Sequence, residues 1–173
     1  MKLLITGASG FVGSFLLKHL VTEAKHEVAI IVREPENAWR IQMALENVYL
    51  IEGSIDSHES YRDQFVSFKP DVVIHLAWDG VGGQNRNDTG QWRNVPYMLE
   101  LMEIAIDSGV HTFVGLGSQA EYGSINACID ENEATNPTTL YGASKLAACN
   151  VGQAVASTSK MRFVWLRLFS SYG

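Results

Sequence analysis

The chain has 173 residues, of which 46% are hydrophobic, and this is enough to bury one sizeable core, so we expect a single domain. The formal net charge of −6 argues against a nucleic-acid-binding protein, whose phosphate contacts would require a basic surface. No apolar run approaches the roughly 18 residues that a membrane-spanning helix needs, so we expect a cytoplasmic protein with no membrane partner.

Apolar runs typical of strands alternate with helical periodicity along the whole chain. The predicted strands are 2–6, 27–33, 48–52, 71–77, 111–117 and 162–168, and the predicted helices are 11–23, 36–45, 57–67, 91–108 and 139–158. Strands that alternate with helices form parallel sheets joined by right-handed crossovers. We therefore predict an α/β protein with a doubly wound parallel sheet, a Rossmann fold, in the strand order 3-2-1-4-5-6.

A glycine-rich turn joins the first strand to the first helix. Gly7 permits a sharp turn, Gly10 lets the backbone approach a pyrophosphate, and Gly13 lets the helix pack tightly on the strand. The N–H groups at the start of the helix carry a partial positive charge that favours phosphates. The turn therefore predicts a dinucleotide site. Its predicted cofactor-binding residues are Gly7, Ser9, Gly10, Phe11, Val12 and Gly13.

The end of the second strand indicates which dinucleotide binds. An NAD site needs a carboxylate there to accept hydrogen bonds from the adenosine ribose, whereas this strand ends in Val32 and Arg33. An arginine can pair with the 2′-phosphate of NADP. We therefore predict NADP, bound by Arg33. NAD is the alternative, with Glu34 or Glu36 on the ribose and Arg33 in solvent.

The last predicted helix carries a tyrosine and a lysine four residues apart. Tyr141 and Lys145 project from the same face, so the ammonium can lie near the phenol and favour its ionised form. Such a phenol exchanges a proton with an alcohol or ketone near neutral pH. A tyrosine and a lysine at this spacing also occur on ordinary exposed helices. The glycine-rich turn is what favours the catalytic interpretation.

The order and spacing of these motifs resemble the extended short-chain dehydrogenases/reductases, a family of nucleotide-sugar epimerases, dehydratases and ketoreductases. The turn has the T-G-x-x-G-x-x-G form, residues 72–77 resemble the family's fourth strand, and residues 117–123 resemble the end of its fifth. The resemblance implies three catalytic residues. Ser118 would hydrogen-bond the substrate oxygen, Tyr141 would exchange its proton, and Lys145 would lower the phenol pKa and hold the nicotinamide ribose. Tyr141 is also placed, with Lys145, among the cofactor-binding residues.

The resemblance also implies cofactor contacts after the third strand and at the end of the fourth. Ser54 would hydrogen-bond the adenine amine and Ile55 would pack on the ring, while Asp56 could simply cap the following helix. Leu76 and Ala77 would let the ribose and the nicotinamide approach the fourth strand closely.

Two further residues lie beside the loop predicted at 79–90, which follows the fourth strand. Asn94 matches an asparagine of the family and is placed on the cofactor side, where we expect it to brace its helix. Trp78 replaces a residue that is commonly small in the family, and we expect it to pack in the core.

The residues after Ser118 separate the reactions of the family. Its dehydratases carry Asp and Glu there, for the elimination of water, whereas this chain has Gln119 and Ala120. Glu121 lies one place further on and should point elsewhere from an extended segment. Epimerases usually prefer NAD, so Arg33 favours an NADP-dependent ketoreductase. Residues 77–80 and 117–123 also resemble the 4-ketoreductases of deoxysugar pathways, which implies reduction of a keto group of a nucleotide-linked (deoxy)sugar. The alternatives are an epimerase of the same family and a non-catalytic NADP-binding protein.

Three expectations concern partners and extent. Residues 1–173 resemble only the dinucleotide-binding part of family members, so we expect a fragment that lacks the C-terminal substrate lobe. The histidines form no metal-binding pattern, and we expect no metal. The resemblance implies a homodimer through the helices at 91–108 and 139–158, although the apolar residues of the first could instead face the sheet. These residues are Val95, Leu99, Met102 and Ile106.

Overall fold

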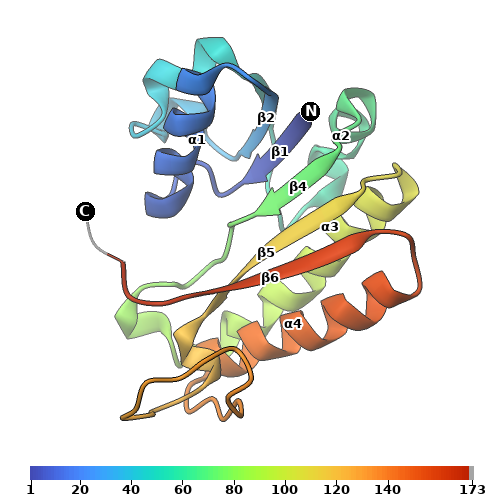
Figure 1. Cartoon of the computed structure of the whole chain (residues 1–173). Coiled ribbons are helices and arrows are strands. Elements are labelled where there is room, and N and C mark those ends of the chain that lie inside the picture. The colour runs from blue at the N-terminus through green and yellow to red at the C-terminus, as the bar shows by residue number, and fades with distance from the viewer. Residues whose placement is uncertain (172–173) are drawn as a thin grey trace.

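One six-stranded parallel sheet forms the centre of the protein (Figure 1). The computed structural model describes residues 1–171. The strands are β1 (Lys2–Thr6), β2 (Glu27–Val32), β3 (Tyr49–Glu52), β4 (Val72–His75), β5 (Thr112–Ser118) and β6 (Arg162–Leu168). Each strand is parallel to its neighbours, and their order is β3-β2-β1-β4-β5-β6. The predicted doubly wound topology is therefore confirmed.

The helices divide between the two faces of the sheet and bury a separate core on each. They are α1 (Phe11–Glu23), α2 (Arg62–Phe68), α3 (Asn94–Asp107) and α4 (Leu140–Ser157). On one face Leu17 of α1 packs with Ile5 and Ile30. On the other face α2, α3 and α4 pack over β1, β4 and β5, with Met102 and Phe113 fully buried between them. Within residues 1–171, no helix is both long and apolar enough to span a bilayer.

The segment between β2 and β3 is not the α-helix predicted at 36–45. It forms two short 3-10 helices, Pro35–Asn37 and Gln42–Asn47. Ala38 and Ile41 are buried against the α1 side of the sheet, whereas Trp39 and Met43 are exposed. Two buried residues do not make the wide apolar stripe that holds an α-helix on a core, so the prediction was wrong.

The apolar residues of α3 face the sheet. Met102 is fully buried, and Val95, Leu99 and Ile106 are partly buried against the same core. They therefore take the second of the two orientations considered from the sequence. A homodimer through α3 and α4 stays a prediction.

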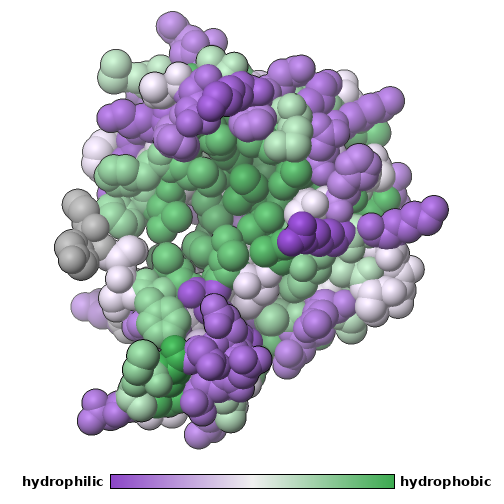
Figure 2. Space-filling view, viewed as in Figure 1, coloured by the Kyte–Doolittle hydropathy of each residue, from purple (hydrophilic) through white to green (hydrophobic). Residues whose placement is uncertain are grey.

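One face of β6 is open. Phe163 points toward Gly152 of α4, so the alternating residues Leu166 and Leu168 lie on the opposite face. They are 51% and 36% exposed. Figure 2 shows an apolar surface in the middle of the same view, where Figure 1 places β4, β5 and β6.

Candidate active site

A cavity of about 930 Å³ lies along the carboxyl ends of the strands, where a doubly wound sheet binds its ligands. Its walls come from the turn before α1, the segments that follow β2 to β5, and the first turns of α4. The structure brings all the sequence-predicted site residues to this cavity. They are Gly7, Ser9, Gly10, Phe11, Val12, Gly13, Arg33, Ser54, Ile55, Leu76, Ala77, Asn94, Ser118, Tyr141 and Lys145.

The turn between β1 and α1 is pressed against the end of β4. Gly7 has a φ of 73°, and a Cβ on it would lie 2.6 Å from the backbone nitrogen of Ala77 and 2.7 Å from the carbonyl carbon of Leu76. A Cβ on Gly13 would overlap the carbonyl oxygen of Gly7. Only glycine fits these two positions, which leaves the start of α1 open to the cavity. This backbone cradle fits the pyrophosphate of a dinucleotide.

Gly7→Ala is expected to destabilise the protein and to abolish dinucleotide binding. The new Cβ would meet backbone atoms of Leu76 and Ala77, in addition to the cost of a positive φ, which is about 1–2 kcal/mol. Gly109 is the matched control, because its φ of 76° is similar and no atom lies within 4 Å of an added Cβ. Denaturant unfolding of both alanine variants checks the prediction. Equal losses would show that the contact with β4 is unimportant.

A buried hydrogen-bonded pair ties β1 to β4 beneath this turn. The hydroxyl of Thr6 lies 2.8 Å from Nδ1 of His75 and also accepts a hydrogen bond from the backbone nitrogen of Ala77. Burial, and then the nearby charge of Lys145, lower the pKa of His75 to about 3. The imidazole is therefore neutral at physiological pH, and its role is to fix the two strands.

At the end of β2, Arg33 and not a glutamate faces the cavity. Among residues 32–36, Val32 and Arg33 line the wall. The carboxylate of Glu34 instead accepts a hydrogen bond of 2.6 Å from the side chain of Asn37. The residues proposed to bind NAD in place of Arg33 thus lie away from the cavity.

Ser54 and Ile55 lie on the wall after β3. The backbone nitrogen of Ser54 donates to the hydroxyl of Ser60, which holds the segment in a tight turn. Asp56 also lines the cavity and does not cap the 3-10 helix that follows, since that helix begins after Ser57.

Asn94, which was expected to brace its helix, ties the start of α3 to the start of the loop after β4. Its side-chain oxygen accepts from the backbone nitrogen of Asp79 at 2.7 Å, and its side-chain nitrogen donates to the carbonyls of Asp79 and Gln91. These bonds hold the loop on α3. A contact between Asn94 and the cofactor stays a prediction.

Ser118 ends β5, and Tyr141 and Lys145 lie in the first two turns of α4. All three side chains are less than 9% exposed. Hydrogen bonds fix the start of α4: the hydroxyl of Thr139 accepts from Gly142 N–H, and the carbonyl of Arg86 accepts from Tyr141 N–H at 2.8 Å. The loop after β4 therefore holds Tyr141 through a hydrogen bond to the backbone N–H of Tyr141.

The ammonium of Lys145 is enclosed by a carbonyl and by aromatic rings. Its Nζ donates to the carbonyl of Leu116 at 2.6 Å and lies 3.7 Å from the ring centroid of Trp78. It lies 5.9 Å from the ring centroid of Tyr141, on the same helix face. Burial lowers the pKa of Lys145 to about 7, and the carboxylate of Glu121 opposes this shift. Trp78 packs in the core as expected, and no local pattern in the sequence indicates its contact with the ammonium.

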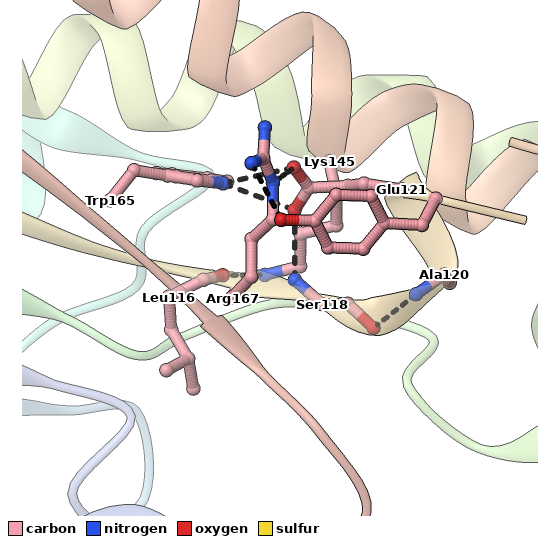
Figure 3. A network of polar contacts seen from close by, with 8 residues as sticks. Leu116, Ser118, Ala120, Glu121, Lys145, Trp165 and Arg167 are labelled. Atoms are coloured by element: carbon pink, nitrogen blue, oxygen red, sulfur yellow. Dashed lines mark hydrogen bonds and ion pairs between the residues drawn. The ribbon is translucent and has the colours of Figure 1, made fainter. Parts of the chain in front are cut away.

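Glu121 points back to Ser118, and the expectation that it would point elsewhere was wrong. Residues 119–121 form a 3-10 turn in which the carboxylate of Glu121 accepts from the backbone nitrogen of Ser118 at 2.8 Å. The same carboxylate accepts from Nε1 of Trp165 and from Nε of Arg167, and Figure 3 shows this network. The spacing of Ser118 and Glu121 is that of a capping box, which could have predicted the contact.

Known proteins resemble this chain over its whole length. The profile of the NAD dependent epimerase/dehydratase family matches residues 3–173. The dTDP-6-deoxy-L-talose 4-dehydrogenase (NAD(+)) of Aggregatibacter actinomycetemcomitans is 26% identical over 98% of this chain and 61% of its own length. The UDP-glucose 4-epimerase of Streptomyces lividans is 33% identical over 90% of this chain and 48% of its own length.

Solved structures show the same likeness. The crystal structure of UDP-glucose 4-epimerase from Brucella ovis in complex with NAD matches 99% of this chain with a TM-score of 0.85 and 26% identity. The chain covers 53% of that structure, and it spans about half to three-fifths of the length of the curated relatives above. The glycine-rich turn, the sheet order and the match over residues 3–173 agree. The chain therefore belongs to the NAD dependent epimerase/dehydratase family, the extended short-chain dehydrogenases/reductases.

Proposed function

We propose that this chain is the dinucleotide-binding domain of an NADP-dependent oxidoreductase that reduces a keto group of a nucleotide-linked deoxysugar. One observation carries the proposal. Ser118, Tyr141 and Lys145 line the same cavity as the glycine-rich turn and Arg33. A proton donor and a dinucleotide cradle thus share one space, which a protein that only binds the cofactor would not require.

The three side chains divide the chemistry between them. The Oγ of Ser118 accepts from the backbone nitrogen of Ala120 at 3.2 Å, which leaves its O–H to donate to the substrate carbonyl. Tyr141 gives its phenolic proton to the same oxygen as negative charge develops there. The nearby ammonium of Lys145 favours the phenolate that remains. A nicotinamide dinucleotide, when bound, supplies the hydride.

Elimination of water is not part of the proposal. The side chains after Ser118 are an amide and a methyl group, at Gln119 and Ala120, which supply neither acid nor base. The next carboxylate, that of Glu121, is fully buried and accepts hydrogen bonds from Trp165 and Arg167. These hydrogen bonds make Glu121 a structural residue, so its carboxylate is not free to act as the acid or base of an elimination.

Arg33 supports NADP over NAD. An arginine at this wall matches the 2′-phosphate, and the neighbouring Glu34 is hydrogen-bonded to Asn37 outside the cavity. The dehydrogenase and the Brucella ovis structure named above are both described with NAD. The preference for NADP proposed here therefore rests on Arg33 of this chain and not on these relatives.

Arg33→Asp is expected to lower the affinity for NADPH about tenfold or more, while the affinity for NADH is kept or raised. The change removes a charge-assisted pair with the 2′-phosphate and supplies an acceptor for the ribose. Calorimetric titration of both proteins with both nucleotides measures the preference. Arg162→Asp is the control, because it makes the same change in net charge at the exposed amino end of β6. A wild-type protein that binds NADH more tightly than NADPH would refute the NADP assignment.

A second candidate is a nucleotide-sugar epimerase, which the named UDP-glucose 4-epimerases among the relatives favour. The same serine, tyrosine and lysine would serve it. The two reactions differ in the use of cofactor. Stoichiometric oxidation of NADPH by a nucleotide-linked 4-ketosugar identifies the reductase. Inversion of a nucleotide sugar without net consumption of cofactor identifies the epimerase.

The proposal includes a homodimer and a cytoplasmic location. Leu140 and Val151 are 44% and 41% exposed on α4, which supports contact with a second copy at that helix. The chain has a net charge of −6, so the proposal includes no nucleic-acid partner.

A further inference from the structure

The ammonium of Lys145 lies against the aromatic face of Trp78 in a cation–π contact. The ring centroid lies 3.7 Å from Nζ, and the carbonyl of Leu116 accepts from the same atom. Both side chains are nearly buried, at 9% and 4% exposed. The face of an indole attracts a cation, most strongly where water is excluded. Trp78 and the carbonyl of Leu116 are thus the nearest groups that hold the charged end of Lys145.

Gln91 fixes the plane of this indole. Its side-chain oxygen accepts from Nε1 of Trp78 at 2.9 Å, and its side-chain nitrogen donates to the carbonyls of Gly80 and Asn85. Gln91 is only 2% exposed. A buried amide with three hydrogen bonds has one favourable orientation, so the tryptophan that it holds has little freedom to rotate.

The loop that Gln91 holds also contacts the catalytic helix. The carbonyl of Arg86 accepts from Tyr141 N–H, and the side chain of Asn87 accepts from Leu140 N–H at 3.2 Å. The rings of Trp78 and Tyr141 meet edge to face, with centroids 6.3 Å apart and planes at 87°. Trp78 therefore contacts both Tyr141 and Lys145, and Gln91 holds Trp78 and the loop that contacts the start of α4.

We propose that Trp78 is a positioning residue for Lys145 and that Gln91 fixes Trp78 in place. This rests on the proposed function, because it is the reaction at Tyr141 that needs the ammonium. A carboxylate in the place of Trp78 would form an ion pair and cancel much of the positive charge that the phenol feels. The indole holds the ammonium without a formal charge of its own, so the charge stays available to Tyr141.

The contact between Trp78 and Lys145 is tested by NMR of the lysine side chains, which requires no substrate. The ε-methylene protons of Lys145, assigned from the loss of their signal in Lys145→Met, should resonate well upfield of those of the other lysines, because the Nζ beside them lies 3.7 Å from the ring centroid of Trp78. Trp78→Leu should return them to the ordinary range, and Trp78→Phe should keep part of the shift. Ordinary values in the wild type, or a shift unchanged by Trp78→Leu, would overturn the proposal.

Its consequence for the reaction is tested by steady-state kinetics of the full-length protein. Trp78→Leu should lower kcat about tenfold, Gln91→Met should lower it less, and Trp78→Phe should restore most of it, with small changes in KM for the nucleotide sugar. Phe65→Leu is the control, since Phe65 is a fully buried core residue on α2. It should lose stability and keep its kcat.

The outcomes separate this inference from the proposed function. A kcat of Trp78→Leu equal to that of Phe65→Leu would overturn the positioning role. Gln91→Met keeps the ring of Trp78 and removes only its hydrogen-bond partner, so an unchanged kcat and lysine shift in that variant would overturn the role of Gln91. A wild type without reductase or epimerase turnover would refute the proposed function. The lysine chemical shifts alone would then decide whether Trp78 holds the ammonium of Lys145.

Discussion

Tyr141→Phe is expected to lower turnover by about 10²–10⁴-fold, because the variant keeps the ring and loses the phenolic hydroxyl that supplies the proton. Binding of the dinucleotide should change far less, since the glycine-rich turn and Arg33 are untouched. The measurement is kcat of the full-length protein with a nucleotide-linked ketosugar and NADPH, beside calorimetric titration of the cofactor. Full turnover by Tyr141→Phe would refute the role of Tyr141 as proton donor.

Tyr61 offers a matched control for this substitution. It is fully buried on the α2 side of the sheet, and its hydroxyl has no hydrogen-bond partner within the described residues. Burial, and then the charge of Glu100, raise its pKa well above the ordinary range. Tyr61→Phe removes an unsatisfied polar group and should therefore keep both turnover and stability. A loss of turnover here as large as at Tyr141 would show that the assay responds to general damage.

Lys145 illustrates how function and stability oppose each other in this site. Its native pKa of about 7 lies below the ordinary value of 10.5, so the unfolded chain binds more protons than the native protein between these pH values. The contribution of this group to stability therefore rises with pH from about 7 to about 10.5, and it is destabilising below that window. A buried lysine is costly, and its place beside Tyr141 favours a catalytic role.

The site residues that were predicted from the sequence belong to motifs whose members lie close together in the chain. Gly7, Gly10 and Gly13 follow a strand and open a helix, and Tyr141 and Lys145 lie one turn apart on one face. Such patterns depend on a few neighbouring residues, so they are readable without the fold. The parallel sheet follows equally from the alternation of strands and helices, and its strand order is the one typical of dinucleotide-binding sheets.

The residues that were missed act across long separations in the chain. Glu121 meets Trp165 and Arg167, which lie 44 and 46 residues further on, and Gln91 acts on a tryptophan 13 residues before it. No local pattern predicts these partners, because they become neighbours only when the parallel strands bring distant segments together. The capping box at Ser118 was the one local signal for Glu121.

Glu121→Gln is expected to lower the free energy of unfolding by about 3 kcal/mol, because it breaks a pair whose carboxylate is fully buried. The amide keeps one oxygen for the backbone of Ser118 or the indole of Trp165, and its N–H groups face the N–H of Arg167. Urea unfolding measures the loss. Glu131→Gln is the control, since Glu131 is exposed, and it should change the free energy by no more than about 0.5 kcal/mol.

The same substitution should affect the reaction beyond its effect on stability. Ser118 is held at its backbone nitrogen by Glu121, and the carboxylate also keeps the pKa of Lys145 from falling further. Glu121→Gln should therefore lower kcat under conditions in which the variant is fully folded. The loss should grow as the pH rises toward about 7 and level off above it, where Lys145 of the wild type also loses its proton. Adding Arg167→Met should restore stability, because no unpaired guanidinium is left, but it should not restore kcat. Recovery of both together would mean that the network serves the fold alone, and that Ser118 and Lys145 need no support from Glu121.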